Sequence, residues 1–190
     1  MSSTVLYMSM SLDGFIAGPN ETPDNPLGDD GERLHAWDFT GAGGGANRRI
    51  YDEFMSTGAV VAGRGTFEPA GGWGGDHHGD VPIFILSRHP MPAWAAEWPN
   101  VHYGNDMEAA MRDAKQAAGD RNVLVHGAST AQRALNAGLL DELEIHLIPV
   151  LLGAGRPLFE NLGVAQRELE RLRVVEGGGG VTHLRYRVRR

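Results

Sequence analysis

The chain of 190 residues contains no cysteine, which excludes disulfide bonds, thiolate zinc sites and a cysteine nucleophile. No apolar run approaches the roughly 20 residues that a membrane-spanning helix needs. The N-terminus also lacks the basic start and apolar stretch of a signal peptide. Basic residues are few, since 17 against 24 acidic ones give a net charge of −7. These absences predict a cytoplasmic protein that binds neither a membrane nor nucleic acid.

The composition that remains is that of an ordinary globular protein, with 42% hydrophobic and 22% charged residues. It predicts a single domain over residues 1–190 with a substantial core. Short apolar runs predict buried strands, and amphipathic stretches between them predict helices. The predicted strands are Thr4–Ser9, Ala59–Ala62, Val81–Leu86, Asn122–Val125 and Leu143–Leu152, and the predicted helices are Arg48–Ser56, Met107–Ala118 and Thr130–Ala137.

Strands that alternate with helices predict an α/β fold, with a mainly parallel sheet covered by helices on both faces. The C-terminal part of the chain has a different pattern. Glu168–Glu176 and Val181–Arg189 are alternating, extended runs joined by four glycines. We therefore expect an antiparallel hairpin that closes one edge of the sheet.

Two glycine-rich segments, Gly18–Gly31 and Gly41–Gly45, are predicted as irregular loops. Loops of this kind are typical either of a lid over a site or of mobile surface, and the sequence leaves both open. The run GAGGGA at Gly41–Ala46 formally matches a dinucleotide-binding fingerprint. It does not follow a predicted strand, so we reject that interpretation.

Two predicted strands end in residues that suit a phosphate group. In VVAGRGTFE, Gly63 allows close approach to the backbone, Arg64 offers a fork of donors, and Thr66 offers a hydroxyl or a helix cap. In VPIFILSR, Ser87 and Arg88 follow the next strand, where an arginine suits the 2′-phosphate of NADPH. Each feature alone also fits a glycine turn or a solvated arginine.

A third strand end, in VHGAST, places Gly127, Ala128, Ser129 and Thr130 before and within the start of a helix. Free amide groups at a helix N-terminus, with the helix dipole, suit a pyrophosphate. Ser129 or Thr130 could equally act as a plain N-cap. The three strand ends together predict a nucleotide site beyond the carboxyl edge of the sheet.

These motifs, with MSLDGFIAG (Met10–Gly18) and IPVLLGAGRPLF (Ile148–Phe159), resemble the dihydrofolate reductase superfamily. The resemblance is closer to the reductase domain of the riboflavin-biosynthesis deaminase–reductase and its stand-alone relatives, and it spans nearly the whole chain. It implies a three-layer fold with an antiparallel C-terminal edge, NADPH as cofactor and a homodimer. It assigns phosphate groups to Gly63, Arg64, Thr66 and Gly127–Thr130, the 2′-phosphate to Ser87 and Arg88, and the nicotinamide to Ile16 and Ala17.

Two departures limit what the resemblance implies about the substrate. Dihydrofolate reductases carry an acidic residue near the position of Asn47, and asparagine can hydrogen-bond a heterocycle but cannot supply that charge. The deaminase half of the riboflavin enzyme needs a cysteine-containing zinc site. We therefore expect weak or no folate reduction, and at most the reductase activity alone.

Asp13, in SLDG, is the first candidate for orienting the substrate, although an Asp-Gly pair also favours a tight turn. Trp37 and Trp73 offer flat faces to a heterocycle, or core packing. Gly153 in LLGAG indicates close backbone approach or a bulge. Trp37, Asn47 and Gly153 are the candidate substrate residues.

The pair in DHHG (Asp76–Gly79) does not predict a metal site, because adjacent histidines point in different directions and no third ligand follows at regular spacing. His126 and His146 are interpreted as structural.

We therefore predict an NADPH-dependent oxidoreductase of a small pyrimidine or pterin-like heterocycle. The nearest named activity is 5-amino-6-(5-phosphoribosylamino)uracil reductase. The alternatives are a dihydrofolate reductase and a non-catalytic NADP-binding or sensor protein.

Overall fold

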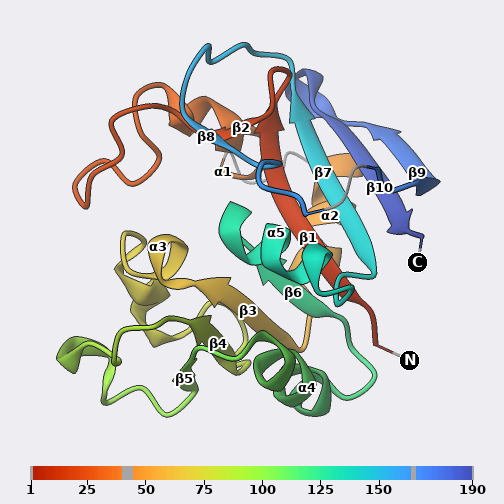
Figure 1. The fold of residues 1–190 in the computed structure, drawn as a ribbon. Helices are drawn as coiled ribbons and strands as arrows, with labels where there is room; N and C mark the ends of the chain where they lie inside the picture. Colours follow the sequence, from red (N-terminus) through yellow and green to blue (C-terminus); the bar gives the residue numbers. More distant parts are fainter. Residues whose placement is uncertain (1, 40–44, 164–165, 190) are drawn as a thin grey trace.

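The computed structural model describes residues 2–39, 45–163 and 166–189, and within them an eight-stranded sheet forms the centre of an α/β fold (Figure 1). Its strand order is β5-β4-β3-β6-β1-β7-β10-β9. The strands from β5 to β7 run parallel, whereas β10 is antiparallel to β7 and β9 is antiparallel to β10. The strands are β1 (Thr4–Ser11), β3 (Ala59–Gly63), β4 (Ile83–Leu86), β5 (Val101–Gly104), β6 (Val123–His126), β7 (Glu142–Ile148), β9 (Leu169–Glu176) and β10 (Thr182–Val188).

Helices cover both faces of the sheet, as the sequence predicts. α4 (Met107–Ala118) and α5 (Ala128–Asn136) lie on one face, and α2 (Gly45–Met55) lies on the other (Figure 1). There are also two short helices. α1 (Ala36–Phe39) precedes α2, and α3 (Arg64–Phe67) follows β3. Among the residues that the structure describes, no helix is both long and apolar enough to cross a bilayer.

β1 shows how the sequence divides the core into layers. Its successive side chains point to opposite faces, as the pleat of a strand requires. Leu6 and Met8 belong to the cluster that includes the apolar faces of α4 and α5, whereas Val5 and Tyr7 belong to a second cluster against which Phe54 of α2 packs. Burial on both faces explains why this strand is a continuous apolar run rather than an alternating one.

The predicted elements are confirmed with shifts at their ends. α4 has the predicted bounds, and the C-terminal hairpin is present as the β9–β10 edge. The predicted strand Leu143–Leu152 ends at Ile148, directly before Pro149, which has no N–H to donate to a strand ladder. The loop that follows leads to β8 (Arg156–Pro157), which pairs with β2 (Phe15–Ala17) outside the main sheet. The sequence did not predict β5, because its four residues VHYG include an exposed histidine and an exposed glycine and so form no apolar run.

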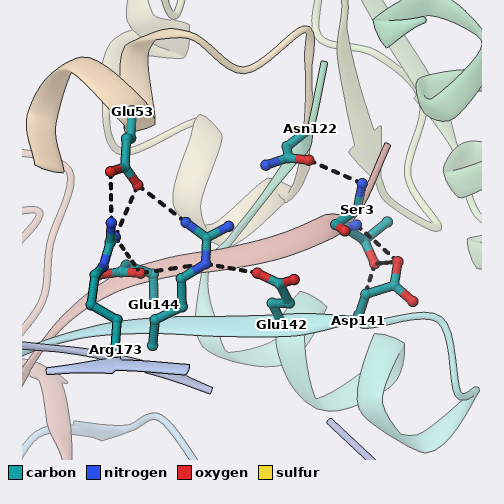
Figure 2. Close-up of polar contacts among 9 residues, drawn as sticks. Ser3, Glu53, Asn122, Asp141, Glu142, Glu144 and Arg173 are labelled. Atoms are coloured by element: carbon teal, nitrogen blue, oxygen red, sulfur yellow. Dashed lines mark hydrogen bonds and ion pairs between the residues drawn. The ribbon is translucent and has the colours of Figure 1, made fainter. Parts of the chain in front are cut away.

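A network of charged side chains joins α2 to the antiparallel edge (Figure 2). Glu53 of α2 forms a two-pronged ion pair with Arg173 of β9, at 2.6 and 2.9 Å. Arg173 also bonds Glu144 of β7 at 3.0 Å, and Arg185 of β10 bonds Glu142 and Glu53 at 2.7 and 3.1 Å. Four elements are therefore held by one cluster of ion pairs.

Glu144 is the buried member of this cluster, with no exposed surface. Burial raises its pKa and the two arginines oppose that rise. Its Oε1 and the Nε of Arg173 have no hydrogen-bond partner in the described structure. A buried carboxylate of this kind depends on its neighbours for compensation, so removing one arginine is more damaging than losing a surface pair.

We expect Arg173→Met to lower the free energy of unfolding by about 2–4 kcal/mol, because it leaves Glu144 with weaker compensation. Urea denaturation measures this change. The matched control is Arg189→Met, whose pair with Glu168 is exposed (3.7 Å) and is expected to contribute less than about 1 kcal/mol. Equal losses for the two variants would contradict this interpretation.

Candidate active-site cleft

Two of the glycine turns that the sequence singles out touch each other at the carboxyl edge of the sheet. β3 and β6 are neighbouring parallel strands, so the turns that follow them lie side by side. A Cβ on Gly63 would lie 3.1 Å from Thr130 Oγ1 and 3.3 Å from Ser129 Oγ. A Cβ on Gly127 would overlap Thr66 Oγ1. Glycine is needed at Gly127, where φ is positive and the Thr66 hydroxyl occupies the space of a side chain, whereas at Gly63 a side chain would be in tight contact with the two opposing hydroxyls.

A cleft of about 490 Å³ opens beside this contact. Its walls come from β1, β2, α2, α3, the loop before β4, the start of α5 and β8, and from the segment 18–31, which lies on the same side of the sheet as α3 (Figure 1). The predicted residues that line it are Ile16, Ala17, Thr66 and Gly127. Its other lining residues include Glu21, His35, Tyr51, Phe54, Trp73, His77, His126 and Arg156.

The remaining predicted cofactor residues are not among those that line the cleft. Ala128, Ser129 and Thr130 form the first turn of α5, and Arg64 begins α3. Arg64 is exposed and pairs with Glu68 at 3.3 Å. Leu86 pairs in register with Gly63, so Ser87 and Arg88 lie at the neighbouring strand end but outside the residues that line the cleft.

The structure corrects the capping roles of three hydroxyls. α3 begins at Arg64 and α5 at Ala128, so the N-cap positions are Gly63 and Gly127. Thr66, Ser129 and Thr130 lie inside their helices and do not cap them. Neither N-cap has a side chain, so the first amides of both helices lack a side-chain acceptor.

The carboxylate of Asp13 is surrounded by hydrogen-bond donors of the protein itself, one hydroxyl and two backbone amides. Ser11 Oγ donates to its carboxylate at 2.5 Å, and the amides of Leu152 and Gly153 donate at 3.2 and 2.7 Å. The Ser11 hydroxyl and these amides lower the Asp13 pKa. Asp13 and Gly153 therefore fix the loop before β8 against the β1–β2 turn, and neither residue lines the cleft. A substrate-orienting role for them stays a prediction.

Asn47 and Trp37 are also held by contacts within the protein. Asn47 accepts from the Gly178 amide (3.1 Å), donates to the Gly178 carbonyl (3.3 Å) and contacts His183 (3.2 Å), so it is not brought to the cleft. Trp37 donates to Ser9 (2.9 Å) and lines a small inner cavity of about 40 Å³. This cavity shares five lining residues with the cleft: Met8, His35, Tyr51, Phe54 and His126.

Sequence reasoning missed Arg156 and Glu21, which form an ion pair of 2.6 Å across the cleft. A Cβ on Gly65 would lie 3.7 Å from Arg156 Nη1, so the guanidinium lies beside α3. The signal in the sequence is a lone arginine directly after LLGAG. Glu21 belongs to the predicted loop Gly18–Gly31, which is closed by hydrogen bonds such as Gly18 N–H to Leu27 O (2.8 Å).

That loop forms one wall of the cleft in this structure, and whether it also acts as a lid stays a prediction. The other predicted loop, Gly41–Gly45, lies outside the described residues apart from Gly45, which begins α2.

Histidines contribute to the walls of the cleft and of the inner cavity, and the sequence indicated structural roles for two of them, His126 and His146. His77 and His126 line the cleft and His146 lines the inner cavity. Burial, with smaller effects of His126 and His78, lowers the pKa of His77 to about 3. Burial also lowers the pKa of His146 well below its usual value and that of His183 to about 4. These three imidazoles are therefore neutral at physiological pH.

The described residues contain no group of three or more histidine, aspartate or glutamate side chains arranged to hold a metal ion. In DHHG, His77 and His78 instead contact each other through their Nδ1 atoms at 2.7 Å.

Stability is expected to fall as pH falls from 7 to 5. In the unfolded chain His183 binds a proton near pH 6.5, whereas in the folded protein its pKa is about 4. The unfolded state then binds more protons, which lowers the free energy of unfolding. His183→Gln should reduce this loss by roughly 1–2 kcal/mol in urea denaturation at pH 7, 6 and 5. His102→Gln, on exposed β5, is the control, and an unchanged slope in His183→Gln would refute the assignment.

Gly127→Ala is expected to destabilise the protein by about 2–4 kcal/mol, since its φ of +90° is strained for alanine and the methyl would displace Thr66. Gly138→Ala is the matched control at the other end of α5. Its φ is +68° with open space around a Cβ, so only the backbone term of about 1 kcal/mol applies. Thermal or urea unfolding that gives the same loss for both variants would exclude the contact with Thr66.

Comparisons with known proteins agree with this architecture. A putative riboflavin biosynthesis protein from Shewanella sp. PV-4 superposes with a TM-score of 0.75 and 22% identity, covering 99% of each chain. A pyrimidine reductase-like protein from Corynebacterium diphtheriae gives 0.67 at 14% identity, over 100% of this chain and 92% of its own. RibD from Acinetobacter baumannii gives 0.58 at 19% identity, and this chain spans 59% of its length.

These likenesses establish the fold, and no curated protein matches the sequence. The family described as the RibD C-terminal domain matches residues 3–183. The chain therefore belongs to the RibD C-terminal domain family, with its dihydrofolate reductase-like fold.

Proposed function

We propose that this protein is an NADPH-dependent reductase of a small pyrimidine or pterin-like heterocycle. The observation that carries the proposal is the contact between the turns Gly63–Thr66 and Gly127–Thr130 beside a cleft. In open α/β sheets, ligands bind beyond the carboxyl ends of the strands. Family membership supports the same cofactor and reaction class.

The residues present fit a dinucleotide. The amides of Ala128, Ser129 and Thr130 belong to the first turn of α5, where they have no helical carbonyl partner, and they suit a pyrophosphate. The two glycines remove the side chains that would obstruct this approach. Ile16 and Ala17, buried at the wall of the same cleft, would lie against the nicotinamide.

NADPH supplies the hydride when it is bound, and the protein supplies position and a pocket with little water. Aromatic and aliphatic side chains make up much of the cleft wall, which favours a planar ring. Asp13 is a poor proton donor because its pKa is lowered and both of its oxygens accept hydrogen bonds. We therefore assign protonation to water, and assign to Asp13 the positioning of the loop before β8.

The nearest named activity remains 5-amino-6-(5-phosphoribosylamino)uracil reductase, in keeping with the pyrimidine reductase-like and riboflavin-related names of structural neighbours. Folate reduction is less well supported, because the carboxylate among the described cleft-lining residues is Glu21, which is paired with Arg156. NADPH oxidation assayed with pyrimidines and dihydrofolate distinguishes these activities. Tight NADPH binding without turnover of either would favour the non-catalytic alternative. The homodimer and the cytoplasmic location stay proposals.

Arg64→Ala and Arg88→Ala test the cofactor site. Each should weaken NADPH binding by about 1.5–3 kcal/mol, the typical contribution of a hydrogen bond to a charged group. Arg88→Ala should leave NADH binding unchanged, because only NADPH carries the 2′-phosphate.

Isothermal titration calorimetry with both cofactors provides the measurement. Arg112→Ala, on the exposed face of α4, is the control for loss of one positive charge. Equal losses of NADPH and NADH affinity in Arg88→Ala would rule out its contact with the 2′-phosphate.

A further inference from the structure

A chain of hydrogen bonds runs from the protein backbone to the wall of the cleft through two histidines. His78 Nε2 lies 3.1 Å from the carbonyl oxygen of Thr57 and 3.0 Å from its hydroxyl. The Thr57 hydroxyl itself donates to the carbonyl of Phe54 at 2.9 Å. At the other end, His78 Nδ1 contacts His77 Nδ1 at 2.7 Å, and His77 lines the cleft.

These partners determine which nitrogens carry protons. A carbonyl oxygen only accepts, so neutral His78 has its proton on Nε2 and its Nδ1 is an acceptor. His77 must then donate from Nδ1 in the contact between the two rings. A neutral imidazole has one N–H, so His77 Nε2 is left as an acceptor.

His77 Nε2 is available to a ligand. No hydrogen bond to a described residue uses this atom. The described polar side-chain atoms that are buried without a partner are Glu144 Oε1 and Arg173 Nε, so His77 Nε2 is not sealed inside the core. The ring is held in place by Trp73, with centroids 4.6 Å apart at 80°.

The protons of a second histidine pair, His146 and His183, are assigned in the same way from their hydrogen-bond partners. The Gly178 amide and carbonyl fix the orientation of the Asn47 amide, so His183 donates from Nε2 to Asn47 Oδ1 (3.2 Å). His183 Nδ1 then accepts from His146 Nδ1 (2.9 Å). His146 lines the inner cavity, and its remaining nitrogen is likewise unprotonated.

His126 follows the same rule, since its Nδ1 lies 3.2 Å from the carbonyl of Tyr7 and must donate to it. His77, His126 and His146 of this wall therefore each direct a ring N–H into the protein. Among the described residues that line the cleft and the inner cavity, the carboxylate is Glu21 and the guanidinium is Arg156, and these two pair with each other. The rest of the described wall offers no lysine or arginine to a phosphate group.

We propose that the inner end of this cleft binds a neutral, planar heterocycle through an N–H or amino donor of the ring, with His77 Nε2 as the acceptor and His78 as its positioning residue. The inference rests on the proposed function only in taking this cleft as the substrate site. It narrows the substrate to unphosphorylated rings, and so departs from the phosphoribosyl substrate of the nearest named activity. It also assigns substrate specificity to a histidine pair far from Asp13 in the sequence.

The first test compares two fluorescent pteridines that differ at two ring nitrogens, where methyl groups replace the N–H donors. Lumazine carries two N–H groups, and 1,3-dimethyllumazine carries none. Fluorescence titration of the full chain with NADP⁺ present should give lumazine binding about 3- to 10-fold tighter, the range for one neutral hydrogen bond. Equal affinities would overturn the proposal, and so would the absence of binding by either probe.

Variants locate the effect. His77→Phe keeps an aromatic ring against Trp73 but removes the acceptor, so the affinity ratio should fall to about 1 with dimethyllumazine affinity unchanged. His78→Leu removes the partner of His77 Nδ1 and so allows His77 to carry its proton on Nε2. Although residue 78 does not line the cleft, this variant should lower the ratio of lumazine to dimethyllumazine affinity. His102→Phe, on β5, is the control and should keep the wild-type ratio. A merely structural role would weaken both probes equally, and a wild-type ratio in His77→Phe would contradict the assignment.

A readout on the unmutated protein covers the case in which a variant fails to fold. Long-range ¹H–¹⁵N correlation of histidine-labelled protein should show His77 protonated on Nδ1, and the Nε2 resonance should shift with lumazine but not with dimethyllumazine. Protonation on Nε2 would overturn the proposal.

Uridine and uridine 5′-monophosphate test the charge. We expect the phosphate to give no gain in affinity, and tighter binding of the monophosphate would show that Arg156 leaves Glu21 to bind it and would refute the neutral-substrate inference. NADPH binding is measured separately by calorimetry. Its loss would reject the proposed function, whereas its presence with equal binding of the two lumazines would reject only this inference.

Discussion

The approach of β3 to β6 at their carboxyl ends is the constraint on which the site depends. Parallel pairing places the turn after each strand against the other, and the hydroxyls of Thr66 and Thr130 fill the positions where Gly127 and Gly63 lack side chains. The free amides of α5 and the wall formed by Ile16 and Ala17 then lie beside one cleft. A side chain at Gly127 would collide with Thr66 and disturb this contact between the two turns.

The network of ion pairs and the histidines of the cleft lie in two different regions of the molecule. The ion pairs around Glu144 join α2 to β7, β9 and β10, so the antiparallel edge is fixed to the helix that also carries Tyr51 and Phe54 into the cleft. Inside the cleft, the charged pair Glu21 and Arg156 is accompanied by several histidines. Burial lowers the pKa of His77 and His146, and contacts that lead to Thr57, Tyr7 and the Asn47 side chain direct histidine protons into the protein.

Much of the fold was predictable because β1, β3 and β6 are buried on both faces and α4 has a clear amphipathic pattern with an Asp106 cap. β5 was not, since its short run includes exposed polar residues whose pairing depends on β4. The same limit applies to the site. Asp13 lies in a turn whose residues suggest a catalytic role, yet its carboxylate accepts hydrogen bonds from amides about 140 positions away in the chain.

The sequence by itself determined the α/β class, the antiparallel C-terminal edge and the glycine turns, because periodicity and glycine placement are local properties of the chain. Only the tertiary structure decided that Arg156 meets Glu21, that Asn47 turns toward Gly178, and that His77 lines a cleft. Those outcomes depend on which distant segments share a space. The protonation of a histidine likewise follows from a partner such as Thr57, 21 residues from His78, which no local pattern records.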